Sequence, residues 1–195
     1  MLQLQKRDKE IIDFITKVKA IDTNTITKLF FPSLRVAQNR LTKLHENGYL
    51  ARFQKDNIHP FIYYIKGNKP RNLNHAVTVA KFLASLMKLD NIEVIKYVVE
   101  PTFKYNDTVI RPDLFVAYNL NGRLQIAFVE VELSKSIDIK KKYSNYYYSR
   151  AWKNDMPAFP NLIVVSDRTV RNAISSITTV QINKDLSNIS KLIDS

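Results

Sequence analysis

Apolar residues near the start of the chain recur at the spacing of one helical face, at Ile11, Ile12, Phe14, Ile15 and Val18. This spacing predicts an amphipathic helix over residues 8–20. Residues 22–25 offer N-caps for a second helix that ends near residue 32. Ser33 can cap a third helix that runs to residue 47, with Gly48 just beyond its end.

Two apolar runs, residues 49–53 and 61–65, predict strands joined by a polar loop. The expected order is therefore helix, helix, helix, hairpin. The stretch from Gly67 to Asn74 then combines Gly, Pro and three Asn, which is typical of a linker. We take residues 69–74 as a linker between domains of residues 1–68 and 75–195.

The second domain alternates helical and strand patterns. We expect helices over residues 73–89, 136–155, 168–177 and 184–193, and strands over residues 92–100, 108–118, 123–133, 161–165 and 178–182. Asn121-Gly122 is a strong signal for a hairpin between the second and third strands. The whole chain is therefore expected to be a two-domain α/β (α+β) protein with a mixed sheet.

Composition narrows the class of protein. Apolar residues make up 45% of the chain, but no run is long enough to span a membrane, and the first residues lack an apolar signal core. We expect a cytoplasmic protein without a membrane partner. Because the sequence has no Cys, it excludes disulfides, thiolate zinc sites and Cys nucleophiles.

The net charge of +12 favours a polyanionic partner, although a Lys-rich composition bias explains such an excess equally well. The charge is uneven. Residues 1–70 carry 13 Lys and Arg against 6 Asp and Glu, whereas residues 71–195 carry 17 against 12. The N-terminal region therefore holds more than half of the net charge.

The third predicted helix has two chemically different faces. Its expected buried stripe consists of Leu34, Ala37, Leu41 and Leu44. The opposite face carries side chains that can read base edges, namely Arg35, Gln38, Asn39 and Thr42. Arg40 and Lys43 lie beside that face and suit phosphates.

This region resembles the winged helix family, through Leu41, Leu44 and the following Glu46-Asn47-Gly48-Tyr49-Leu50. The resemblance implies that the helix from Ser33 enters the major groove and that the hairpin touches the DNA backbone. The alternative is a winged helix used for protein contacts. We expect contacts to double-stranded DNA from Ser33, Arg35, Gln38, Asn39, Arg40, Thr42, Lys43, Arg52, Lys55 and His59.

Three acidic residues in the second domain are candidates for a metal site. Asp113 follows Arg111-Pro112, and Glu130 and Glu132 are two apart on one strand, so that both point to one face. Converging carboxylates are suitable ligands for Mg²⁺ or Mn²⁺. The alternative is a solvated strand face.

The pattern resembles the restriction-endonuclease-like superfamily, whose signature is Pro-Asp followed by Asp/Glu-x-Lys. The resemblance implies that Asp113 and Glu130 hold the metal and that Glu132 assists catalysis. Glu132 stands where the family usually has Lys, and Lys135 and Lys140 are the candidates to replace that lysine from nearby. Glu100 is a further candidate member of the acidic cluster.

Residues 140–150 combine Lys, Arg and Tyr on a predicted helix. Lys140 and Lys141 are candidate phosphate contacts, whereas most of the Tyr side chains are expected in the core. Together, the two domains are similar to the replication-relaxation family of plasmids and phages. That resemblance implies a DNA-binding protein of a mobile element, with a metal-dependent nickase as the alternative, and homodimerisation is plausible.

Overall fold

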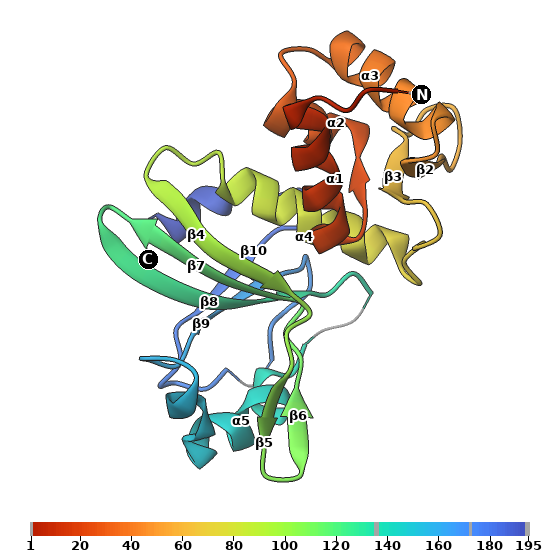
Figure 1. The fold of residues 1–195 in the computed structure, drawn as a ribbon. Coiled ribbons are helices and arrows are strands. Elements are labelled where there is room, and N and C mark those ends of the chain that lie inside the picture. The colour runs from red at the N-terminus through yellow and green to blue at the C-terminus, as the bar shows by residue number, and fades with distance from the viewer. Residues whose placement is uncertain (1, 135–136, 172, 194–195) are drawn as a thin grey trace. The chain divides into compact units, whose positions relative to one another are not determined.

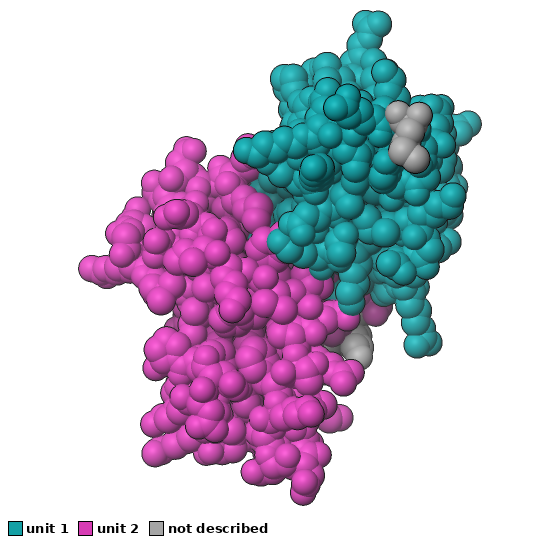
Figure 2. Space-filling view, viewed as in Figure 1, with its two compact units in different colours: residues 1–84 teal, residues 85–195 magenta. Residues whose placement is uncertain are grey.

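A computed structural model describes residues 2–134, 137–171 and 173–193. It is a mixed protein of helices and sheets, as expected, and it divides into two compact units, residues 1–84 and 85–195 (Figure 2). The division lies inside a helix, and the predicted linker of residues 69–74 belongs to unit 1. Among the described residues no helix is both long and apolar enough to cross a membrane.

Unit 1 begins with three helices, α1 (Lys6–Val18), α2 (Thr23–Phe30) and α3 (Leu34–Glu46) (Figure 1). The N-cap residues of α2 and α3 each accept a hydrogen bond through their side chains. The carboxylate of Asp22 accepts from the Thr25 amide at 2.8 Å, and the Ser33 hydroxyl accepts from the Val36 amide. Gly48 follows α3 at a positive φ of 78°, where glycine is strongly favoured. The three predicted helices are confirmed to within a few residues.

A small antiparallel sheet completes this part of unit 1, with strand order β1-β3-β2. The predicted hairpin is confirmed as β2 (Leu50–Phe53) and β3 (Ile62–Ile65), whereas β1 (Ile21–Asp22) was not predicted because two residues give no periodic pattern. The segment after β3 leads into α4 (Leu73–Leu86), whose Ala76 and Val77 pack with Ala20.

Unit 2 contains a five-stranded sheet with the order β10-β9-β8-β7-β4. Its strands are β4 (Ile92–Val99), β7 (Leu114–Leu120), β8 (Arg123–Val131), β9 (Asn161–Val165) and β10 (Thr179–Ile182). β4, β7 and β8 are antiparallel, and β8, β9 and β10 are parallel. The Asn121-Gly122 turn joins β7 to β8 with positive φ at both residues, as the sequence predicted.

The parallel pairing of β8 with β9 requires a crossover, which contains α5 (Ile139–Ser149) and a short 3₁₀ helix, η1 (Ala151–Asn154). Asp138 caps α5 by accepting from the Lys141 amide at 2.9 Å. Tyr143 and Tyr146 of α5 are fully buried, and they pack in a core with Phe128 of β8. A separate hairpin, β5 (Phe103–Tyr105) with β6 (Thr108–Ile110), adds Phe103 to this core.

The predicted helix over residues 168–177 is wrong for the residues that the structure describes there. They form turns and one isolated bridge, from Arg171 to Asp138. The three-residue spacing of Ile174 and Ile177, both in the core, imitates a helical face. The intervening Ser175 and Ser176 favour turns, because serine side chains compete for backbone hydrogen bonds.

The predicted helix over residues 184–193 is reduced to a 3₁₀ helix, η2 (Ile189–Leu192). Local side-chain bonds explain the difference. Asp185 accepts from the Ser187 amide at 2.9 Å, and Asn188 accepts from the Asn183 amide at 2.7 Å. These bonds satisfy backbone groups that a longer helix would have used.

Candidate nucleic-acid interface and buried carboxylate cluster

Helix α3 buries one face and exposes the other, largely as predicted. Ala37, Leu41 and Leu44 are fully buried. The candidate base-reading and phosphate residues Arg35, Gln38, Asn39 and Lys43 are exposed, Ser33 is exposed at the N-cap, and Thr42 is half-buried. Leu34 was expected in the buried stripe but is 44% exposed, so the apolar face starts one turn later, at Ala37.

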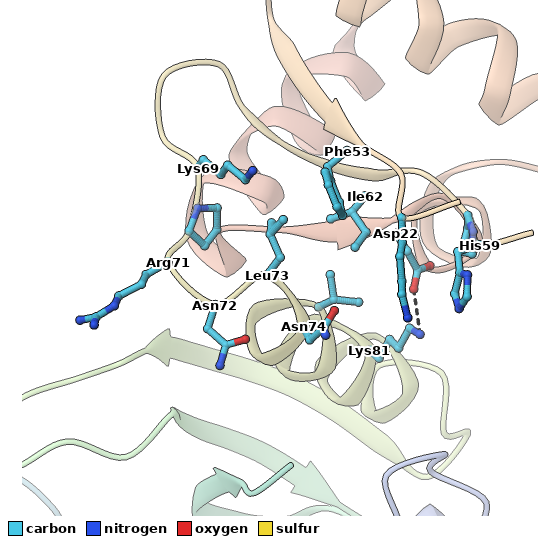
Figure 3. A pocket seen from close by; sticks show the side chains of 14 residues that line it. Asp22, Phe53, His59, Ile62, Lys69, Arg71, Asn72, Leu73, Asn74 and Lys81 are labelled. Carbon is cyan, nitrogen blue, oxygen red and sulfur yellow. Dashed lines mark ion pairs between the residues drawn. The ribbon is translucent and has the colours of Figure 1, made fainter. Parts of the chain in front are cut away.

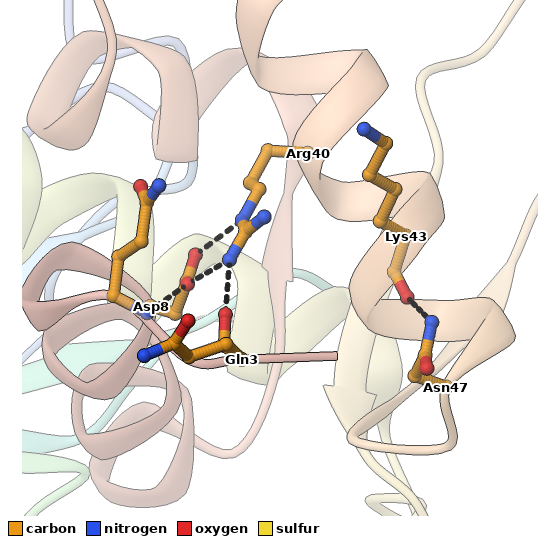
Figure 4. A network of polar contacts seen from close by, with 6 residues as sticks. Gln3, Asp8, Arg40, Lys43 and Asn47 are labelled. Atoms are coloured by element: carbon orange, nitrogen blue, oxygen red, sulfur yellow. Dashed lines mark hydrogen bonds and ion pairs between the residues drawn. The ribbon is translucent and has the colours of Figure 1, made fainter. Parts of the chain in front are cut away.

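The structure gives Arg40 another role than the predicted phosphate contact. Its guanidinium binds both carboxylate oxygens of Asp8, with Nε to Oδ1 at 2.8 Å, and it donates to the Gln3 carbonyl (Figure 4). Asp8 also accepts from the Gln5 amide at 2.7 Å, at the start of α1. Arg40 therefore fastens α3 to α1 through its Nε and Nη2 groups.

Asp8 is 0% exposed, and the pairing is reflected in its pKa. Burial alone would raise the pKa of this carboxyl. The hydrogen bonds from Arg40 and the Gln5 amide, together with the charges of Arg40 and Arg7, lower the pKa below its ordinary value. Asp8 is thus an ionised, buried residue that holds α3 in place.

The β2–β3 hairpin carries the remaining predicted contacts of unit 1. The guanidinium of Arg52 lies over the Phe61 ring at 4.4 Å, which half-buries it. Lys55 and His59 are exposed in the loop. Ile58 at the loop is 92% exposed, although it is a large apolar residue.

Asp56 organises this loop. Its carboxylate accepts from the His59 ring at 2.6 Å and from the amides of Ile58 and His59 at 3.0 Å. These contacts, with the His59 ring first, lower the pKa of Asp56 to about 2. The loop that presents His59 and Ile58 therefore has a defined local conformation.

In unit 2, Glu130 is the buried member of the predicted acidic set, with 2% of its surface exposed. Its carboxylate accepts a hydrogen bond from the Tyr143 hydroxyl. It also forms an ion pair with Lys142, whose Nζ lies 2.6 Å from Oε2 of Glu130. Both partners come from α5. Lys142 of α5 is therefore directed to Glu130, whereas its neighbours Lys140 and Lys141 are exposed.

Burial raises the pKa of Glu130 to about 7, and the neighbouring charge of Asp113 acts in the same direction. The Lys142 charge and the hydrogen bonds from Lys142 and Tyr143 act against it without cancelling it. The Tyr143 pKa is raised well above its ordinary value, by burial and by the Glu130 carboxylate. Glu130 therefore titrates near neutral pH.

The predicted metal ligands do not converge as a three-carboxylate site. Asp113 accepts from the Val131 amide at 2.7 Å, and Glu132 is half-buried beyond the end of β8. Within residues 2–134, 137–171 and 173–193, no group of three or more His, Cys, Asp or Glu side chains is placed to hold a metal ion, Glu100 included. Lys142 and Tyr143 of α5 contact the Glu130 carboxylate. A metal site formed by Asp113 and Glu130 alone stays a prediction.

Lys140 and Lys141, the other predicted phosphate contacts, are exposed in the first turn of α5. Lys135, which could have replaced the missing lysine of the motif, lies outside the described residues. The partners of Glu130 were not foreseen from the sequence. The Asp138 cap was the available signal, since a helix that starts at Ile139 places Tyr143 and Tyr146 on one face, with Lys142 beside them.

A comparison with protein-family models and with curated proteins finds no match for this chain. Among solved structures, the chain is similar to protein VC1899 from Vibrio cholerae, with 13% identity and a TM-score of 0.28. The match covers 95% of this chain and 50% of that one, so the chain spans about half the length of that protein. Functional proposals therefore rest on the chain's own residues.

Proposed function

We propose that this protein binds double-stranded DNA in a sequence-specific manner through α3, and that unit 1 is a winged helix domain. One observation carries the proposal: α3 buries Ala37, Leu41 and Leu44 and exposes a continuous row of hydrogen-bonding side chains on the other side. An exposed helix face with Arg, Gln and Asn is suited to the major groove, where these side chains pair with guanine and adenine.

The spacing of the row supports direct reading of bases. Arg35 and Asn39 are four residues apart, and so are Gln38 and Thr42, which places each pair on adjacent turns of one face. Ser33, at the N-terminus of the helix, lies where a backbone amide and a hydroxyl suit a phosphate. Lys43 adds one positive charge to this exposed face.

The Asp8–Arg40 pair supports the proposal indirectly. It joins α3 to α1 through a bidentate contact between the guanidinium and the carboxylate, which holds α3 in one orientation. Base reading needs such rigidity, because a displaced helix loses its contacts. The hairpin adds Lys55 and His59 as candidate backbone contacts.

In this proposal unit 2 has a restriction-endonuclease-like fold and does not cut DNA, because Glu130 is engaged by Lys142 and Tyr143. Control of replication or relaxation on a mobile element is the setting that the sequence resemblance implies. A supercoiled plasmid incubated with the protein and Mg²⁺ or Mn²⁺ is expected to stay intact. Nicking that disappears in Asp113→Ala would establish the nickase instead.

The direct test is selection of bound sequences from a random duplex library, followed by titration of the selected site. We expect Arg35→Ala combined with Asn39→Ala to weaken binding by at least about 100-fold, since each base contact contributes about 1–3 kcal/mol. The matched control is Lys9→Ala with Thr16→Ala on α1, which removes the same charge from exposed positions.

Glu130→Gln should leave DNA affinity unchanged. Equal binding by the α3 double variant and its α1 control would refute the proposal, as would the lack of any enriched sequence. A selected site with two symmetric halves would indicate that the protein binds as a dimer.

A further inference from the structure

Unit 1 contains a cavity of about 570 Å³ between the β2–β3 hairpin and the segment that leads into α4 (Figure 3). Phe53 and His59 line it from the hairpin side, and Lys69, Leu73 and Asn74 line it from the other. Small-molecule sites usually measure about 300–1,000 Å³. The volume is thus suited to a ligand of modest size.

Positive side chains dominate the wall of the cavity. They are Lys55, Lys69, Arg71 and Lys81, with His59 beside them, and Asp22 is the carboxylate among the lining residues. Figure 3 shows Lys69 near Phe53, whereas Arg71 extends away from the other labelled side chains. The Lys69 ammonium lies 5.1 Å from the centroid of the Phe53 ring.

The single carboxylate is already neutralised. Asp22 is buried, its Oδ1 accepts from the Thr25 amide, and its Oδ2 lies 3.0 Å from the Lys81 ammonium. The remaining lysines therefore give the cavity a net positive charge. The N-terminus of α4, where Leu73 and Asn74 line the cavity, adds the positive end of a helix dipole.

The cavity also has an apolar side. Phe53 and Ile62 of the hairpin and Leu73 and Val77 of α4 line it. Phe53 is itself more than one third exposed, so its ring is available for contact. An inorganic anion would leave these surfaces exposed to water, and an uncharged apolar ligand would leave the lysines unused.

We propose that this cavity binds a nucleoside monophosphate or a closely related nucleotide. The phosphate lies against Lys55, Lys69 and the N-terminus of α4, and the base packs between Phe53 and the apolar residues of α4. The ligand bridges the hairpin and α4. Nucleotide binding at this cavity does not depend on the proposed DNA-binding function.

Isothermal titration calorimetry without DNA tests the site, with each of the four nucleoside monophosphates, adenosine and inorganic phosphate as separate probes. We expect at least one nucleotide to bind more tightly than either fragment. Lys69→Ala should weaken it about tenfold, the loss expected for one charge-assisted hydrogen bond. Lys9→Ala, at an exposed position of α1, is the matched control and should change nothing.

Asn74→Trp fills the cavity from an exposed position and should abolish nucleotide binding while leaving the circular dichroism spectrum unchanged. The proposal is overturned if no nucleotide binds, or if Asn74→Trp binds as the wild type does. It is also overturned if Asn74→Trp weakens only duplex binding, since the cavity then belongs to the DNA path. Nucleotide binding without duplex binding would refute the proposed function alone.

Discussion

Asp8 in unit 1 and Glu130 in unit 2 are two buried carboxylates with opposite electrostatic outcomes. Both are almost completely removed from solvent, and both have a basic partner from a neighbouring helix. The pKa of Asp8 is nevertheless lowered, whereas that of Glu130 is raised to about 7. Burial by itself therefore does not decide whether a carboxyl stays charged.

The number and geometry of the donors explain the difference. Asp8 receives two bonds from the planar Arg40 guanidinium and a third from the Gln5 amide, and Arg7 lies nearby. A guanidinium matches both carboxylate oxygens at once, whereas a lysine ammonium is a single point charge. Glu130 has one lysine and one neutral hydroxyl, and Asp113 adds a repelling charge.

The largest expected effect comes from removing the guanidinium. Arg40→Ala leaves the buried Asp8 carboxylate without its ion-pair partner, so we expect the free energy of unfolding of unit 1 to fall by about 3–5 kcal/mol. Urea denaturation together with amide hydrogen exchange of α1 and α3 would measure it. Asp8→Ala in the same background should recover part of the loss, because the unpaired charge is gone. A small loss, below about 1 kcal/mol, would show that the pair is not needed.

The raised pKa of Glu130 predicts a pH dependence of the stability of unit 2. A carboxyl whose folded pKa lies above its unfolded value of 4.5 stabilises the folded state most below pH 4.5, and this contribution is lost as the pH rises through about 7. We expect the free energy of unfolding to fall by up to about 3 kcal/mol between pH 5 and pH 8. The pH dependence that Asp8 contributes has the opposite sign. Its pKa is lowered, so its contribution to stability is lost only as the pH falls below 3.8, the ordinary pKa of the carboxyl.

Glu130→Gln isolates this contribution, because it removes the titration and keeps an acceptor for the Tyr143 hydroxyl. Urea denaturation at several pH values from 5 to 8 should give a flatter profile for the variant than for the wild type. Parallel profiles for the two proteins would contradict the assignment of the slope to Glu130.

Lys142→Met should increase the difference between the pKa of Glu130 and that of Asp8. Without the ammonium, the pKa of Glu130 rises further, so the variant is destabilised by about 1–3 kcal/mol at pH 8 and much less at pH 6. Carbon-13 NMR of the Glu130 carboxyl measures the pKa directly. Lys141→Met, at an exposed position of the same helix, is the matched control and should leave the pKa unchanged.

The sequence predicts most of the secondary structure where periodicity and caps agree. Asp22, Ser33 and Gly48 mark helix ends, and Asn121-Gly122 marks a turn, because each residue acts on the backbone next to it. The spacing of Ile174 and Ile177 wrongly predicts a helix, since two core residues three apart occur in turns as well as in helices. Local signals therefore succeed where the cause of the structure is local.

The candidate sites are less predictable, because their chemistry depends on residues far apart in the sequence. The exposed face of α3 follows from its own periodicity. The engagement of Arg40 by Asp8 and of Lys142 by Glu130 joins elements that no local pattern relates. The cavity beside the hairpin likewise depends on Phe53 and Lys69, which lie close together although strand β3 separates them in the sequence.

The exposed ion pair of Asp13 and Lys17 can be compared with the two buried carboxylates. We expect its removal to have the smallest effect on stability. Its ammonium lies 2.7 Å from the carboxylate, about as close as the Lys142–Glu130 pair, but both side chains are more than half exposed. Water screens such a pair, so Asp13→Ala should lower the free energy of unfolding by no more than about 0.5 kcal/mol, and less at high salt. Urea denaturation of this variant beside Arg40→Ala compares an exposed ion pair within α1 with a buried ion pair between α1 and α3. A loss as large as that of Arg40→Ala would show that contact distance, and not burial, governs how much these pairs stabilise the fold.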